Sequence, residues 1–256
     1  MKTSTSQDKN KLLHITVAAV FWISVWYAAA YFVKSELLLP YPHDVIRSLL
    51  TLMATGEFYL SVLFSVLRIL GGFLIGIIAG LFCGIVSSVS KLSDVLISPM
   101  MTVIRSTPVA SFIILTLVWF ENTAVPIFIS FLMVTPIIYA QTMLGINKCD
   151  KDILEMTHAY GFTFKRSLVH FWIPSVKPYF ISGLLTSMGL AWKAGIAAEV
   201  LCSPSPSIGK DLYEAKKYLE TPDMLAWTLT VIIMSMLLER LIKKYLTGSK
   251  GVNKNL

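Results

Sequence analysis

Six long apolar stretches constrain the fold of this chain more than any other feature of its sequence. A helix needs about 20 mostly apolar residues to cross a bilayer core, which is about 30 Å thick. The stretches that reach this length are Leu12–Val33, Ser61–Val89, Val95–Phe120, Ala124–Ile146, Pro174–Leu201 and Met224–Leu246. Such runs exclude a transmembrane β-barrel, whose strands are short and alternate polar with apolar residues. The sequence therefore predicts an all-α, polytopic membrane protein with about six transmembrane helices.

The composition agrees with a membrane protein and excludes other classes. Only 14% of the residues are charged and 55% are hydrophobic, whereas soluble domains have about 25% and 45–50%. The three cysteines fall in different layers of the predicted topology and form no CxxC pair, so neither a disulfide framework nor a zinc site is expected. The four histidines are scattered without ligand spacing, and no metal site is predicted.

The basic residues predict the orientation of the chain. With the N-terminus in the cytoplasm, the inside segments hold Lys2, Lys9, Lys11, Lys91, Lys148, Lys151, Lys165, Arg166, Arg240, Lys243, Lys244, Lys250 and Lys254. The outside segments then hold only Lys34, Arg47, Lys210, Lys216 and Lys217. The positive-inside rule therefore favours both termini in the cytoplasm. The net charge of +7 reports topology, and nucleic-acid binding is not expected.

The predicted organisation is a transmembrane domain, residues 12–246, between cytoplasmic tails of residues 1–11 and 247–256. The first apolar stretch is longer than the 7–15 residues of a signal-peptide core, so it is expected to be a retained span. Outer loops are predicted at residues 34–60 and 202–223, with short helices at Asp44–Leu52 and Lys210–Leu219. An inner loop is predicted at residues 147–172.

The inner loop carries large apolar side chains that a simple linker would not need. They are Phe162, Phe164, Leu168, Phe171 and Trp172, and they follow a short helix pattern that ends at Gly161. One explanation is packing against the inner face of the membrane. The other is docking of this segment into a groove of a soluble partner.

The same loop resembles the EAA loop of binding-protein-dependent ABC importer permeases. The family pattern is Glu-Ala-Ala, three residues, Gly, nine residues, then Ile-x-Leu-Pro. This chain has Glu155-Met156-Thr157, Gly161 and Phe171-Trp172-Ile173-Pro174 at the same spacing. Met156 and Thr157 replace the alanines, and Phe171 and Ile173 replace the Ile and Leu.

Further segments are similar to the nitrate/sulfonate/taurine-type permeases, over roughly residues 37–245. They are Ser65-Val66-Leu67-Arg68, Gly72-Phe73, Ser182-Gly183-Leu184, Gly189-Leu190-Ala191-Trp192, Ala197-Ala198-Glu199 and Ser207-Ile208-Gly209.

The resemblance implies a permease subunit in a bacterial cytoplasmic membrane, with the type I importer fold. Its implied partners are a second permease copy, two cytoplasmic ABC ATPases and an extracytoplasmic substrate-binding protein. The implied coupling residues are Glu155, Thr157, Gly161, Phe171, Ile173 and Pro174. The chain has no GxxxxGK[ST] loop, so it is expected to bind no cofactor and to be no enzyme, with ATP and Mg on the ATPase. The implied substrate is a small organic or anionic solute, like a sulfonate, nitrate or a vitamin precursor.

Charges inside the spans are costly and usually face protein or water. They make a list of pathway candidates: Arg68, Arg105, Lys193 and Glu199, with the neighbouring Trp192. Arg68 is expected either to pair with a carboxylate, for which Glu199 is a candidate, or to bind a substrate anion. Arg105 precedes Pro108, which is expected to bend the helix, so it lines a pathway or marks a structural kink. Lys193 is the best candidate for touching a polar or anionic substrate.

Glycines at helical spacing predict close helix packing. Gly72, Gly76, Gly80 and Gly84 follow Arg68 in steps of four residues, and Gly189 and Gly195 lie in the fifth stretch. On a straight helix each step of four drifts by about 40°, which is expected to turn Gly84 off the face of Arg68.

Two other function classes remain open from the residues alone. A secondary transporter or channel would need pore-lining polar rings or ion sites, and would not need a bulky inner loop. An intramembrane enzyme would need a catalytic set within the spans, and no HExxH or GxSxG motif occurs.

Overall fold

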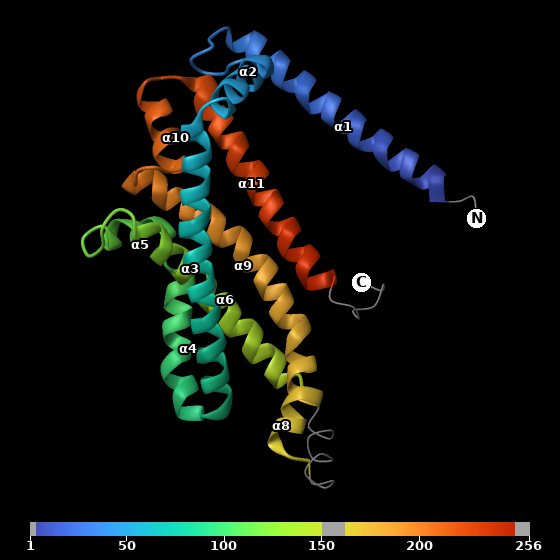
Figure 1. Ribbon diagram of the computed structural model, residues 1–256, viewed down its shortest axis with the longest axis vertical. Helices are drawn as coiled ribbons and strands as arrows, with labels where there is room; N and C mark the ends of the chain where they lie inside the picture. Colours follow the sequence, from blue (N-terminus) through green and yellow to red (C-terminus); the bar gives the residue numbers. More distant parts are fainter. Residues whose placement is uncertain (1–3, 150–161, 249–256) are drawn as a thin grey trace. The chain divides into compact units, whose positions relative to one another are not determined.

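The computed structural model describes residues 4–149 and 162–248, and every regular element in this part of the chain is helical (Figure 1). The elements are α1 (Ser4–Val33), α2 (Pro42–Met53), α3 (Gly56–Val89), α4 (Lys91–Ser106), α5 (Val109–Thr116), α6 (Val125–Asn147), α8 (Phe164–Ser167), a π-helical turn (Leu168–Trp172), α9 (Ile173–Cys202), α10 (Ile208–Lys217) and α11 (Thr221–Gly248). By length and composition, five helices of the described part can cross a membrane, and the α4–α5 pair makes a sixth if it counts as one span. The all-α prediction is confirmed.

The third predicted span is broken rather than continuous. It begins at Lys91, where the Ser90 hydroxyl accepts a hydrogen bond from the Ser93 amide and caps α4. The helix ends at Ser106, because Pro108 lacks an amide hydrogen and forces the preceding Thr107 into an extended conformation. The axes of α4 and α5 differ by 100°. The expected bend is therefore present, as an interruption between two helices.

The glycines of α3 pack against α6, and the two helices run parallel. A Cβ atom on Gly76 would lie 2.7 Å from the Val134 Cβ, and one on Gly80 would lie 2.6 Å from the Thr135 carbonyl oxygen. Gly72 meets α6 near Ile127, and Gly84 meets it near Thr142. Because residue numbers rise together along both helices, the chain between them must run back along α3 before α6 begins, and α4 and α5 lie in this return.

Gly84 lies on this packing face, which corrects the expectation that it turns away. Its added Cβ would lie 2.8 Å from the Thr142 Cβ. The contacting residues of α6 also advance in steps of four, so both helices present the same inclined ridge. Helices that pack along these ridges wrap around each other, and the drift of a straight helix does not separate them.

Helix α9 packs antiparallel to α6 and completes the core. A Cβ on Gly195 would lie 2.6 Å from Cγ1 of Ile69 and 2.8 Å from Oγ of Ser130, so α3, α6 and α9 meet at this glycine. A buried apolar cluster joins α5 to the first half of α6 and the last part of α9. It consists of Ile113, Val125, Ile129, Ala194, Ala198 and Cys202.

The chain forms two compact units. The first comprises residues up to Tyr59 together with Asp211–Thr230, and the second comprises Leu60–Lys210 and residues from Val231 onward. Inside the first unit, the Phe58 and Trp227 rings stack with centroids 5.1 Å apart. The hydroxyl of Ser48 also donates a hydrogen bond to Asp223. The network described next lies entirely within the second unit.

Candidate functional site

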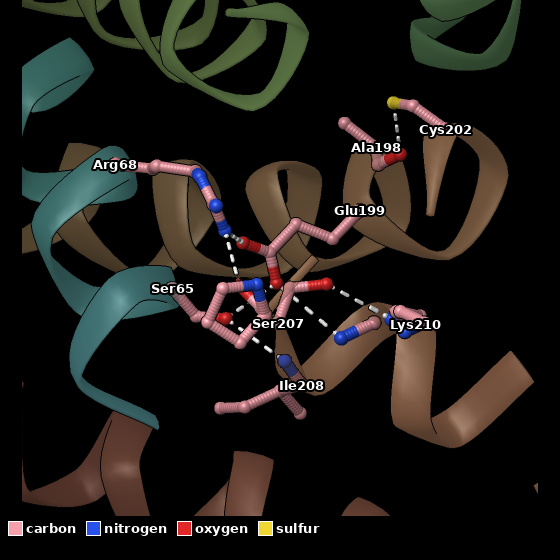
Figure 2. A network of polar contacts seen from close by, with 10 residues as sticks. Ser65, Arg68, Ala198, Glu199, Cys202, Ser207, Ile208 and Lys210 are labelled. Atoms are coloured by element: carbon pink, nitrogen blue, oxygen red, sulfur yellow. Dashed lines mark hydrogen bonds and ion pairs between the residues drawn. The ribbon is translucent and has the colours of Figure 1, made fainter. Parts of the chain in front are cut away.

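Arg68 of α3 and Glu199 of α9 form a buried ion pair in the second unit. Nη1 of Arg68 lies 3.4 Å from Oε1 of Glu199, and the side chains are 9% and 0% exposed. Figure 2 shows the guanidinium directed at the carboxylate. The pairing expected from the sequence is therefore present. It satisfies two charges that a bilayer would penalise strongly if they were alone.

The other carboxylate oxygen of Glu199 accepts two more hydrogen bonds. The Ser65 hydroxyl donates to Oε2 over 2.6 Å, and the Gly209 amide donates to the same atom over 3.3 Å. The Ser65 oxygen in turn accepts the Ile208 amide over 3.0 Å. Glu199 and Ser65 thus cap two amides at the start of α10, where free amides favour negative charge.

Arg68 also holds the turn that joins α9 to α10. Its Nη1 donates to the Pro206 carbonyl over 2.8 Å. The turn starts at Ser203, whose φ of 49° is left-handed and whose amide bonds the Glu199 carbonyl over 2.7 Å. At its end, the Ser207 hydroxyl accepts the Lys210 amide over 3.0 Å. Side chains from two long helices therefore fix residues 203–210 in place (Figure 2).

This arrangement is structural rather than reactive. The buried carboxylate has three hydrogen-bond donors around it, and Gly209 approaches so closely that a Cβ there would collide with Glu199. A fully satisfied polar network of this kind rigidifies the groups it joins. Arg68 and Glu199 are thus engaged with the protein, which does not support a direct solute contact for either residue.

Trp192 is also a packing residue in this structure. Its side chain is 1% exposed, and its indole Nε1 donates to the Val231 carbonyl of α11 over 3.0 Å. The pathway role predicted for it is not supported, because every face of the ring is covered. Gly189, one turn earlier, faces the Glu239 carboxylate of α11, and an added Cβ would lie 3.0 Å from Oε1.

Lys193 and Arg105 are exposed, unlike the other pathway candidates. Lys193 lies on an exposed stripe of α9, between residues that are buried on either side. The stripe consists of Ser182, Thr186, Leu190, Lys193, Ala197 and Leu201. Arg105 lies in the last turn of α4, directly before the break at Pro108.

The predicted coupling residues fall partly outside the described residues. Glu155, Thr157 and Gly161 belong to residues 150–161, which the structure does not describe. Phe171 lies in the π-helical turn, and the centroid of its ring lies 6.0 Å from the centroid of the Phe162 ring. Ile173 and Pro174 open α9, and both are exposed.

The sequence contained signals for two groups that were not selected as site residues. Ser65 lies three residues before Arg68, hence on the same face of α3. Ser65–Arg68, Ala197–Glu199 and Ser207–Gly209 were three separate points of family resemblance, and the structure brings them into one network. Glu239 lies within the sixth apolar stretch, where a carboxylate is unusual.

Comparison with known proteins assigns the chain to a family. The sequence profile of the "Binding-protein-dependent transport system inner membrane component" family matches residues 72–243, most of the chain. The chain belongs to this family. It is an ABC importer permease, a multi-pass protein of the inner membrane and not an enzyme. The alternatives of a secondary transporter, a channel and an intramembrane enzyme are therefore not retained.

Individual relatives agree with this assignment. A putative aliphatic sulfonates transport permease, SsuC of Escherichia coli, is 29% identical over 82% of this chain and 77% of its own length. Its namesake from Bacillus subtilis is 24% identical over 82% and 76%. The bicarbonate transport system permease CmpB of Synechococcus elongatus is 25% identical over 70% and 64%.

A solved structure shows the same fold. A chain of the MetNI methionine ABC transporter, in inward-facing conformations, aligns with a TM-score of 0.64 at 13% sequence identity. The alignment covers 76% of this permease and 97% of that chain. The type I importer permease fold predicted from the sequence is confirmed.

Proposed function

We propose that this permease forms, with a second copy of itself, the membrane pathway for a small anionic solute of the sulfonate or bicarbonate kind. The relatives named for aliphatic sulfonates and for bicarbonate support this class, since both solutes are anions. A vitamin-precursor-like organic solute is the second candidate that the family resemblance implies. The permease itself is proposed to hold no cofactor, with ATP and Mg bound by partner ATPases.

The observation that carries the proposal is the position of Lys193. It lies nine residues before the end of α9, about 14 Å along the helix axis at 1.5 Å per residue. Its side chain is exposed, although the preceding Trp192 and the following Ala194 are buried. A cation at this depth raises the free energy strongly where it faces lipid, and much less where it faces protein or water. The exposed stripe of α9 is therefore proposed to face the pathway and the second copy.

Replacement of Lys193 tests this assignment. Lys193→Ala should abolish uptake of the solute while the transporter complex still assembles, and Lys193→Arg should retain part of the uptake because it keeps the charge. Lys91→Ala, an exposed lysine at the start of α4, is the matched control and should transport normally. Normal uptake by Lys193→Ala would eliminate the pathway role.

The inner loop is proposed to couple the permease to the ATPases. Two observations support docking to a protein: Phe162 is an exposed aromatic side chain, and Lys165 and Arg166 lie exposed beside it. Gly161→Asp or Glu155→Lys should weaken ATPase binding or separate ATP hydrolysis from transport, with Lys148→Gln as a control outside the motif. Unchanged assembly and coupling in both variants would refute the coupling role.

The outer side of the first unit is proposed to dock the substrate-binding protein. A pocket of about 330 Å³ there is lined by the acidic residues Glu57, Asp211, Glu214, Glu220 and Asp223, together with the stacked Phe58 and Trp227. Its acidity suits basic patches on the partner.

A charge variant tests this docking surface. Glu57→Gln combined with Glu220→Gln should weaken binding-protein stimulation of ATP hydrolysis, most at low salt. Glu121→Gln, an exposed carboxylate of an outer connection that does not line the pocket, should not. If the binding protein stimulates ATP hydrolysis equally with the unmodified permease, the double variant and Glu121→Gln at low salt, this pocket is not the docking surface.

A further inference from the structure

A cleft opens between α3, α6 and α9 at the end that the positive-inside rule places at the cytoplasm. Its volume is about 440 Å³, within the range of about 300–1,000 Å³ common for ligand sites. The walls are apolar and include Ile85 of α3, Ile146 of α6, and Val176 and Phe180 of α9. Trp172 of the π-helical turn also lines it, and tryptophan is enriched at the depth of lipid headgroups.

Two polar residues, Thr142 and Lys177, line this cleft beside its apolar walls. The Thr142 side chain is 1% exposed, and its hydroxyl has no hydrogen-bond partner in the structure. Lys177 lines the same cleft, is exposed, and forms no ion pair with any described residue.

We propose that this cleft binds an anionic phospholipid of the inner leaflet. One acyl chain lies between the apolar walls, and the anionic headgroup pairs with Lys177. Basic pockets between transmembrane helices on the cytoplasmic side suit acidic lipid headgroups in this way.

Charge complementarity favours this occupant over a free solute. A small sulfonate would satisfy Lys177 and leave most of the apolar wall uncovered. A zwitterionic lipid would fill the wall, but its own ammonium group already balances the phosphate that would face the lysine. An anionic phospholipid covers the apolar wall and supplies a counter-charge for Lys177, and it is available at this depth of the membrane.

Lipid retention on the purified transporter tests the proposal. The full-length permease, in its transporter complex, is placed in nanodiscs of mixed phosphatidylcholine and phosphatidylglycerol, and retained lipids are counted by native mass spectrometry. Phosphatidylglycerol should be retained preferentially. Lys177→Gln should reduce that preference about fivefold, as expected for one lysine near an anionic headgroup. Lys148→Gln, an exposed inner lysine outside the cleft, should not change it.

A second pair of variants tests the acyl chain without changing charge. Ile85→Trp fills the cleft and should abolish retention. Ile78→Trp, seven residues earlier on the same face of α3 and outside the cleft, should not. Equal retention of the two lipids with no effect of Lys177→Gln would overturn the proposal. Disulfide-linked dimers formed by Ile85→Cys would also overturn it, since the second copy would then cover the cleft.

Discussion

Replacing Glu199 by glutamine removes the negative charge of the buried network and nearly preserves its shape. The Arg68 guanidinium, 9% exposed, then has no counter-charge. Neutralising one partner of a buried ion pair costs about 3–5 kcal/mol. The amide also offers one acceptor oxygen where the carboxylate offers two, so one donor among Ser65, Gly209 and Arg68 faces an NH₂ group. We expect Glu199→Gln to lower the free energy of unfolding by about 3–5 kcal/mol.

The same geometry predicts an order among related variants. Arg68→Met should cost at least as much as Glu199→Gln, because it leaves the fully buried Glu199 carboxylate without a counter-charge, whereas Glu199→Gln leaves a guanidinium that is 9% exposed. The double variant Arg68→Met/Glu199→Leu should recover much of the loss, since replacing both partners with apolar groups is often neutral. Glu239→Gln, an exposed glutamate of α11, is the matched control and should change stability by about 0.5 kcal/mol or less.

The assay is unfolding of the purified permease in mixed micelles with rising dodecyl sulfate, followed by tryptophan fluorescence. A double-mutant cycle on Arg68→Met, Glu199→Leu and the double variant Arg68→Met/Glu199→Leu isolates the coupling between the two charges. If Glu199→Gln unfolds within about 0.5 kcal/mol of the unmodified protein, as expected of an exposed substitution, the burial and pairing argument is wrong. A double variant as unstable as the sum of the single variants would show that the charges do not interact.

Three further predictions use the same unfolding titration. Gly72→Ala should cost about 1–3 kcal/mol by overpacking against Ile127 and Ser130, whereas Gly71→Ala, with no atom within 4 Å of its added Cβ, should be neutral or slightly stabilising. Equal effects of the two glycine variants would contradict the packing of α3 on α6. Trp192→Phe should cost about 0.5–1.5 kcal/mol by loss of its hydrogen bond to Val231; no change would mean that this bond contributes nothing. Gly209→Ala should cost about 1–3 kcal/mol because its Cβ meets Glu199, and tolerance of this change would show that the start of α10 is free to move.

The sequence predicted the helices well because crossing a bilayer imposes a length and a composition on each segment. The predicted Ala124–Ile146 and Pro174–Leu201 differ from α6 and α9 by one residue at each end. The short outer helices were also found, since Pro42 and the Ser207 cap mark their starts locally. The resemblance to the family was visible in the spacing of the inner loop, which is a linear pattern, and the match over residues 72–243 then showed the family.

Which residues meet was decided by tertiary structure. Nothing in the spacing of the glycines alone keeps Gly84 on the α6 face, because the ridge that keeps it there depends on a second helix. It named Arg68 and Glu199 as a pair, yet Ser65, Pro206 and Gly209 entered the network only when the turn after α9 folded back. Composition along one chain reports how deep a residue lies in the membrane. Whether a charge such as Lys193 is exposed or, like Glu199, enclosed depends on helix rotation, which only packing determines.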